Sequence, residues 1–233
     1  MDANQLLERY AAGERDFHEA ILRDVNLEGA ILPDINLINA DLREAYLKNT
    51  DLRGAKLGFA NCRGANLNES NLIGANLISV DLSWASLILA DLSWANLYMA
   101  ILKGSNLIGT NLIGSTMQSA NLTDSKLIAA DLQAADLQDA NLSGSNLTGA
   151  KFIRANLERA RLIESKLMGA NFKGANLKDA SLRNSNLHLA NLSQAILIGT
   201  DLSEAILCEA WLEGVNLDQA ILEDTITAFV RMS

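Results

Sequence analysis

Few side chains in this 233-residue chain could carry out chemistry. The sequence holds two histidines and two cysteines, and Glu209 follows directly after Cys208. A cysteine within reach of a histidine such as His188 could form an activated thiolate or part of a metal site. The chain contains no phosphate-binding loop, CxxC pair, nucleophile elbow or HExxH motif. His188 and Cys208 are therefore the one pair on which a catalytic interpretation can rest.

Composition and charge exclude several classes of function. The net charge is −9 and the isoelectric point is near 4.7, so unassisted binding to nucleic-acid phosphates or anionic lipid is not expected. Two cysteines do not make a disulfide framework, which favours a reducing compartment. The N-terminus shows no secretory signal pattern, and Asn, Asp or Gly interrupts every apolar run. We therefore expect a cytoplasmic protein with no direct nucleic-acid partner and no membrane partner.

A five-residue repeat extends over almost the whole chain. Every position from 17 to 222 whose number ends in 2 or 7 is Leu, apart from Phe17, Cys62, Met117, Phe152 and Phe172. This pattern gives about 42 units without an insertion or a deletion. Ala, Ser, Thr or Val nearly always stands two residues before the leucine, and Asn or Asp usually stands one before it. Most glycines stand two residues after it.

A period of five fits neither a helix nor a strand. It would spread the leucines around a helix and would flip them between the two faces of a strand. The backbone must instead turn every five residues and return each leucine to one core. Small residues two before the leucine would also face inward, and glycine two after it would supply positive φ at a tight turn. The pattern predicts a solenoid around a column of leucines, with Cys62 as a small core residue.

Units such as ANLIG, NLSGS and ANLKD resemble those of the pentapeptide-repeat family over positions 17–222. The resemblance implies an all-β fold, namely a right-handed quadrilateral β-solenoid with four units, hence 20 residues, in each coil. Such a rod would be about 50 Å long at about 4.8 Å per stacked layer. The N-terminal LLERYAAGERDF is similar to that of cyanobacterial members, including a regulator of heterocyst differentiation. This similarity implies a cyanobacterial cytoplasmic regulator.

The N-terminus departs from the repeat. Asp2 followed by Gln5 resembles a capping box, and Leu6, Leu7 and Tyr10 share one helical face. This predicts a short α-helix that covers the first coil, which would otherwise expose leucine and unpaired strand edge.

The repeat pattern divides the chain into three parts. We expect an N-terminal helical cap over residues 1–14, the pentapeptide-repeat solenoid over 15–224 and a C-terminal cap or tail over 225–233. The tail could fold over the last coil or pair with a second copy. We expect a monomer, with a dimer through the C-terminal end, as in some gyrase-binding members of the family, as the alternative.

A 20-residue coil would place His188 and Cys208 in one column on adjacent coils. We interpret both as ordinary outward residues, because a convex surface offers no pocket and no third ligand. A minor Cys/His-based activity at this pair is kept as a second alternative. The Asn and Asp residues that precede leucine would form hydrogen-bonded ladders along the rod. We therefore expect no enzyme activity, no catalytic residue, no metal and no cofactor.

The middle coils are apolar and carry little charge. Between residues 70 and 123 only Asp81, Asp91 and Lys103 are charged. Three isoleucines would stack in one column, with a tryptophan and a leucine at its corners and a fourth isoleucine on the next side. Contiguous exposed apolar surface usually marks an interaction site. We predict a protein-interaction site formed by Trp84, Ile88, Leu89, Ile108, Ile113 and Ile128.

These features favour a non-catalytic function. The sequence predicts a protein-interaction scaffold or regulator that docks an unidentified protein partner on the side of a rigid rod. The alternative is a DNA-mimic inhibitor of a DNA-binding enzyme such as gyrase, because gyrase-binding members of the family present acidic faces. Here seven acids are concentrated at one end, in residues 201–224. Residues 151–183 carry an excess of Lys and Arg on all four sides of the rod, which we call the basic girdle. Because the acids do not form one continuous face, this alternative ranks second.

Overall fold

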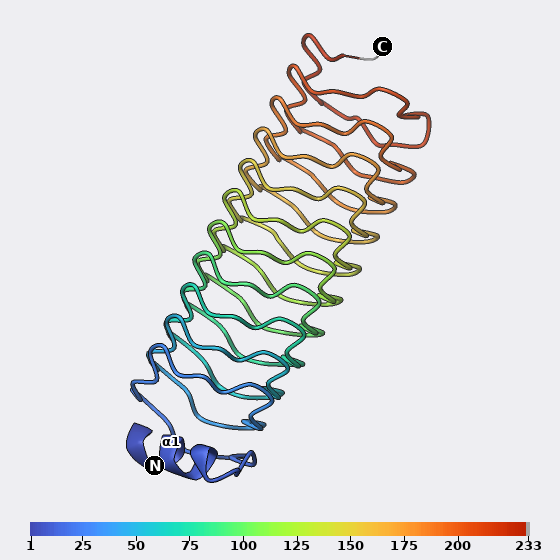
Figure 1. Ribbon diagram of the computed structural model, residues 1–233. Helices are drawn as coiled ribbons and strands as arrows, with labels where there is room; N and C mark the ends of the chain where they lie inside the picture. Colours follow the sequence, from blue (N-terminus) through green and yellow to red (C-terminus); the bar gives the residue numbers. More distant parts are fainter. Residues whose placement is uncertain (232–233) are drawn as a thin grey trace.

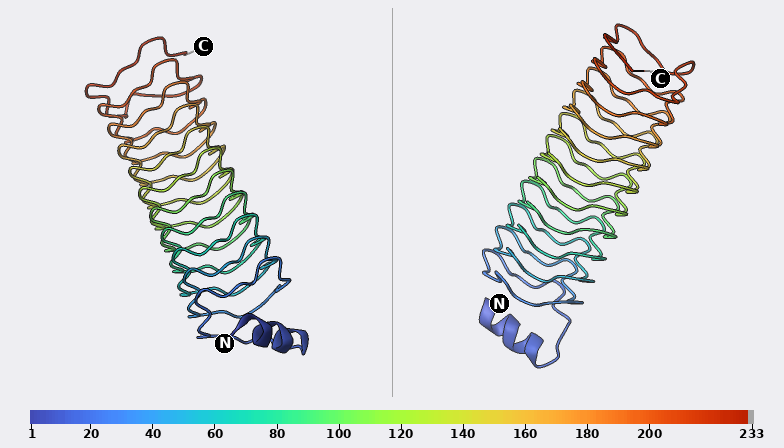
Figure 2. Two further views of the ribbon diagram at one scale, coloured as in Figure 1. Left: turned by 90° about the vertical axis from the view of Figure 1, so that its left-hand side faces the viewer. Right: turned by 45° about the horizontal axis from the view of Figure 1, so that its top comes forward.

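The chain winds into a long rod of stacked coils that begins with one short helix (Figure 1). The computed structural model describes residues 1–231. Helix α1 spans Ala3–Ala11 and lies across the N-terminal end of the rod (Figure 2). No helix within the described part is long and apolar enough to cross a membrane.

The β structure consists of isolated parallel bridges rather than long strands. From Asp16↔Asn36 to Trp211↔Arg231, bridges recur every five positions and join residues 20 positions apart, except at Asn216, which forms no bridge. Each coil therefore has four sides of five residues. The fold is a right-handed quadrilateral β-helix, which confirms what the family resemblance implies.

The backbone amides of the five-residue units find their hydrogen-bond acceptors in a repeating pattern. In one typical unit, the amides of Asn121, Leu122 and Asp124 donate to carbonyl oxygens of adjacent coils at 2.7–3.1 Å. The amide of Ser125 closes the turn on the carbonyl oxygen of Leu122 at 3.2 Å. The fifth amide, that of Thr123, donates to the side-chain oxygen of Asn121 at 3.1 Å. Asn or Asp before the leucine thus supplies the one acceptor that the coil lacks.

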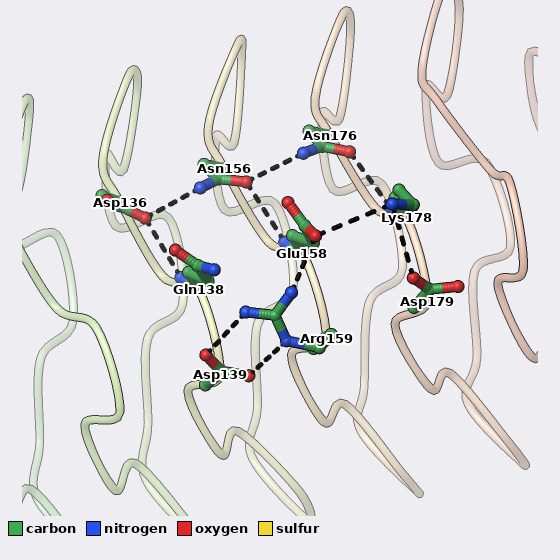
Figure 3. A network of polar contacts seen from close by, with 9 residues as sticks. All are labelled: Asp136, Gln138, Asp139, Asn156, Glu158, Arg159, Asn176, Lys178 and Asp179. Atoms are coloured by element: carbon green, nitrogen blue, oxygen red, sulfur yellow. Dashed lines mark hydrogen bonds and ion pairs between the residues drawn. The ribbon is translucent and has the colours of Figure 1, made fainter.

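The predicted side-chain ladder exists only in places. Asn156 donates from Nδ2 to Oδ1 of Asp136, and Asn176 donates from Nδ2 to Oδ1 of Asn156, each at 3.0 Å (Figure 3). At most other units the Asn or Asp oxygen accepts from the amide two residues later, as Asn71 does from Ile73 at 3.2 Å. A ladder along the whole rod is therefore wrong, although the local turn does not prevent it, since Oδ1 of Asp136 and Oδ1 of Asn156 each accept both bonds.

The leucine column forms the core of the rod. All residues of the leucine slots from Leu22 to Leu212 are buried, with at most 3% of their surface exposed. Serine and threonine beside this column hide their hydroxyl groups by donating to carbonyl oxygens, as Ser105 Oγ does to Leu102 at 2.6 Å. Phe152 and Phe172 stack in the column with ring centroids 4.7 Å apart.

Helix α1 closes the N-terminal end as the capping box predicts. Gln5 N–H donates to Oδ1 of Asp2 at 2.9 Å, and Asp2 N–H donates to Oε1 of Gln5 at 3.2 Å. Leu6 is fully buried, and the Tyr10 hydroxyl donates to a backbone carbonyl of the solenoid at 2.7 Å. Leu7 differs from the prediction, because it lies on the exposed side of the helix.

The C-terminal residues continue the coil. Ile226 bridges to Ile206, and Arg231 bridges to Trp211. Over its described part the predicted tail 225–233 thus pairs edge to edge with the preceding coil and does not fold across the end. Residues 232 and 233 lie outside the described residues.

Candidate docking surface

The corner residue, two positions after the leucine, adopts positive φ whether or not it is glycine in every unit from that of Phe17 to that of Thr227, except that of Leu217, whose corner is Gln219. In the coil formed by residues 81–100, the corners are Trp84, Leu89, Trp94 and Met99, with φ between 56° and 62°. Left-handed backbone costs a residue with a Cβ about 1–2 kcal/mol. The repeat imposes this conformation and turns the four side chains outward, so that half or more of each is exposed. We call these four residues the corner ring.

Side chains of the corner ring lie along the rod rather than straight out from it. A Cβ placed on Gly104 would collide with the indole of Trp84, and one on Gly114 would collide with the indole of Trp94. Leu89 lies over the glycine of the next coil in the same way, 2.8 Å from where its Cβ would stand. Glycine one coil later therefore makes room for Trp84, Leu89 and Trp94, whereas Ser119 stands one coil after Met99.

The predicted isoleucines are less exposed than the corners. Ile88, Ile108 and Ile128 follow one another at the same slot of successive coils, and Ile113 occupies the next side. All four are half-buried. They form the floor between the corners, and Leu89 forms the edge that the two sides share.

Two members of the corner ring were not in the predicted site. Trp94 is the most exposed of the four corners, and Met99 completes the ring. The missed signal is the corner slot itself, because four consecutive units place a large apolar residue where glycine or a polar residue usually stands.

The few charges in this region are tied to the backbone. Oδ1 of Asp81 accepts from the amide of Ser83, and Oδ1 of Asp91 accepts from the amide of Ser93, each at 2.9 Å. One oxygen of each carboxylate therefore completes a turn, and the surface between the corners combines half-buried isoleucines with half-buried Ser, Asn and Asp residues.

The structure does not assemble a site from His188 and Cys208. His188 Nδ1 lies 3.0 Å from the backbone carbonyl oxygen of Cys208, to which it donates, and not against the thiol. Among residues 1–231, no three His, Cys, Asp or Glu side chains are grouped so that they could hold a metal ion. The geometry thus shows no thiolate activated by this histidine.

The two cysteines differ in burial, which provides a test of the core assignment. Burial raises the pKa of the Cys62 thiol to about 12, with a smaller effect of Asp81 and Asp41, whereas Cys208 is half-buried. At pH 8 the thiolate fraction of Cys62 should be about a thousandfold below that of a thiol with pKa ~9. We expect Ellman's reagent to titrate one thiol per native chain and two after unfolding. In the Cys208→Ser variant the folded protein should no longer react with Ellman's reagent, which would identify Cys208 as the reactive thiol. Fast reaction of both thiols in the folded wild-type protein would contradict the assignment of Cys62 to the core.

Part of the basic girdle is paired with acids of the same or an adjacent coil, as Figure 3 shows for Arg159 and Lys178. Arg159 donates to both carboxylate oxygens of Asp139 at 2.8 and 3.0 Å and to Glu158 at 2.7 Å. This guanidinium holds the pKa of Asp139 below its ordinary value. Lys178 Nζ lies 3.9 Å from Glu158 and 3.8 Å from Asp179. These cations therefore serve contacts within the rod, whereas no ion pair within residues 1–231 involves Arg154, Arg161, Lys166 or Lys173.

Solved structures of known proteins are similar to this chain. HetL, a pentapeptide-repeat protein involved in heterocyst differentiation regulation in the cyanobacterium Nostoc sp. strain PCC 7120, is 34% identical. The match covers 97% of this chain and 94% of HetL, with a TM-score of 0.65. QnrB1, a plasmid-mediated fluoroquinolone resistance protein, is 18% identical over 91% of this chain and 88% of its own, with a TM-score of 0.34. No match was found among curated protein sequences.

The sequence family that matches this chain is described as Pentapeptide repeats, with eight copies. The matched segments are residues 20–58, 55–93, 90–128, 125–162, 165–197 and 185–224. Together with the identity to HetL over nearly the full length, these matches show that the chain belongs to the pentapeptide-repeat family.

Proposed function

We propose that this protein is a non-catalytic scaffold or regulator that docks a protein partner on the side of its rod. The docking surface consists of Trp84, Leu89 and Trp94 of the corner ring together with Ile88, Ile108, Ile113 and Ile128. Met99 is not part of it, because Met99 stands on the corner opposite Leu89. The exposure of three consecutive large apolar corners is the observation that carries this proposal. The leucine column already supplies the core, so the fold does not need these side chains for its own packing.

The shape of the surface favours a partner that covers two sides of the rod. Leu89 stands on the shared edge, and Trp84 and Trp94 stand at the two outer edges. Rigid aromatic side chains held in place are typical anchors of protein interfaces. The similarity to HetL, which is involved in regulation, supports a regulatory role for such a contact.

Replacement of the three central corners by asparagine tests the proposal. Asparagine tolerates positive φ, so Trp84→Asn/Leu89→Asn/Trp94→Asn should keep the coil while removing the anchors. We expect immobilised wild-type protein to capture a partner from a lysate of the source cells. The triple variant should capture about tenfold less or none, because anchors of this kind each contribute more than ~1 kcal/mol.

The matched control changes three exposed corners outside the ring. Phe59→Asn/Leu189→Asn/Phe229→Asn removes apolar residues of similar exposure and the same backbone conformation. It should capture the partner as wild type does. Equal capture by both triple variants would move the search away from the middle coils.

Three finer points belong to the same proposal. We place the protein in the cytoplasm as a monomer, and sedimentation would reveal the alternative dimer through the C-terminal end.

The structure lends little support to the DNA-mimic alternative, because many acidic side chains form ion pairs within the rod or accept hydrogen bonds from turn amides. Inhibition of gyrase supercoiling at micromolar protein would favour it over the docking scaffold.

A further inference from the structure

The register of the solenoid breaks at one place near its C-terminal end. Asn216 is the one residue at a bridging slot between residues 16 and 231 that forms no bridge. Gly199 N–H donates to the carbonyl oxygen of Gln219 at 2.9 Å, although the repeat would pair it with Asp218. The chain therefore slips by one residue on this side before it returns to register at Ile221.

The slip leaves backbone groups of the preceding coil without partners. One coil earlier, Ile196 N–H donates to Ala175 at 3.0 Å, and Leu177 N–H donates to Ile196 at 2.9 Å. The corresponding groups here, the Ala195 carbonyl and the Leu197 amide, have no backbone partner within residues 1–231. Ala195 is itself buried. A carbonyl and an amide left free on one edge can pair with another extended chain.

An open slot lies beside these groups. It is a pocket of about 400 Å³ whose walls include Gln194, Ile196 and Ile198 on one coil and Asn216 and Asp218 on the other. Ile196 and Ile198 are each 46% exposed, which offers apolar surface to a side chain that enters. Figure 1 shows the coil at this end bowing wider than the coils that precede it.

The coils from residue 201 to 224 carry charge of one sign, whereas Lys173 and Lys178 stand two coils before Glu213 and Asp218 in the same columns. Residues 201–224 contain seven acids and no lysine or arginine. Glu213 and Asp218 stand on the coil that lines the opening, and both are exposed. A ligand that enters the slot therefore meets negative potential, which favours positively charged segments.

We propose that this slot binds an extended, basic segment of a partner protein by β-strand pairing. The segment pairs its backbone with the Ala195 carbonyl and the Leu197 amide, as Asn216 would in an unbroken coil. An apolar side chain of the segment packs on Ile196 and Ile198, and its lysines or arginines face Glu213 and Asp218. This site lies several coils beyond the corner ring and does not depend on it.

The test uses the full chain and a synthetic probe, acetyl-Lys-Lys-Val-Leu-Val-Lys-Lys-amide, in isothermal titration calorimetry. We expect binding by this peptide and at least about tenfold weaker binding by the same peptide with Glu in place of Lys. A probe with N-methylated central residues should also bind at least about tenfold more weakly, because it cannot donate main-chain hydrogen bonds. Equal binding of the basic and N-methylated probes would overturn strand pairing.

Charge reversal beside the slot tests its location. Glu213→Lys/Asp218→Lys should weaken the basic probe about tenfold, because it removes the attracting charges. The control, Glu8→Lys/Glu28→Lys, makes the same change in net charge on exposed residues at the other end of the rod and should bind as wild type does. Equal weakening by both variants would show a general charge effect and overturn the assignment.

Hydrogen exchange separates peptide binding from self-association. The Leu197 amide should exchange much faster than the Leu177 amide in the free protein and become protected when the probe binds. Protection that rises with protein concentration alone would mean that a second copy fills the slot, and would overturn the proposal. The corner-ring triple variant should bind the probe as wild type does, so failure here and failure of the proposed docking surface are distinguishable.

Discussion

Replacement of Phe172 by alanine is expected to lower the free energy of unfolding by about 3–5 kcal/mol, the largest effect of a single side chain in this rod. Phe172 is fully buried and stacks on Phe152 with 2° between the ring planes. Its removal leaves a void the size of a ring in a closed column. The surrounding coils cannot collapse to fill it, because their spacing is fixed by backbone hydrogen bonds. Urea denaturation followed by circular dichroism measures the loss.

Leucine at the same position is the matched control. Leu is the usual residue of the column, so Phe172→Leu should cost roughly 1 kcal/mol, well below the cost of alanine. Phe152→Leu/Phe172→Leu should cost less than the sum of its two single changes by about 0.5–1.5 kcal/mol, because the ring stacking is lost only once. Equal costs for alanine and leucine would show that the rings are not tightly packed.

The sequence predicts the core of this protein almost completely. The reason is that a leucine in every fifth position has one physical solution, a backbone that turns every five residues and stacks its coils. The same logic predicts positive φ at the glycine slot. It extends to Trp84 at φ 62° and Trp94 at φ 59°, because the repeat sets the conformation and not the residue that occupies it.

The candidate surface is predicted only in part. Trp84 and Leu89 are exposed as expected, whereas Ile88 and Ile108 are half-buried between corners. The sequence shows which slot points outward, but the exposure of a side chain also depends on its neighbours one coil away. Those neighbours stand 20 residues apart, and this distance came from the family resemblance rather than from the repeat itself.

The break at Asn216 could not be predicted. The unit VNLDQ that contains it keeps the residue pattern of its neighbours, with Asn before Leu217. In a solenoid each coil is stabilised by the coils on both of its sides. Within residues 1–231 the segment around Asn216 has a neighbouring coil on one of its two edges only. The free-energy difference between the regular and the shifted register is therefore small there, and no residue pattern in the unit indicates which register is adopted.

Gly104→Ala is expected to destabilise the protein by about 2–3 kcal/mol, with a spectroscopic signature that a simple loss of stability would not give. Alanine at φ +67° costs about 1–2 kcal/mol in backbone strain. Its methyl group would also collide with the indole of Trp84, which must leave the rod surface and lose its packing. Tryptophan emission of the native protein should therefore shift to longer wavelength, while urea denaturation reports the change in stability.

Gly74→Ala separates the two effects. Gly74 has nearly the same φ, +64°, but nothing lies within 4 Å of the place where its Cβ would stand. It should show the backbone cost alone, with unchanged emission. In a Trp84→Asn background, Gly104→Ala should cost no more than Gly74→Ala, because no indole remains to be displaced. If Gly104→Ala and Gly74→Ala cost the same in the wild-type background, Trp84 does not rest on the next coil, and the corner ring is a set of free side chains rather than a preformed docking surface.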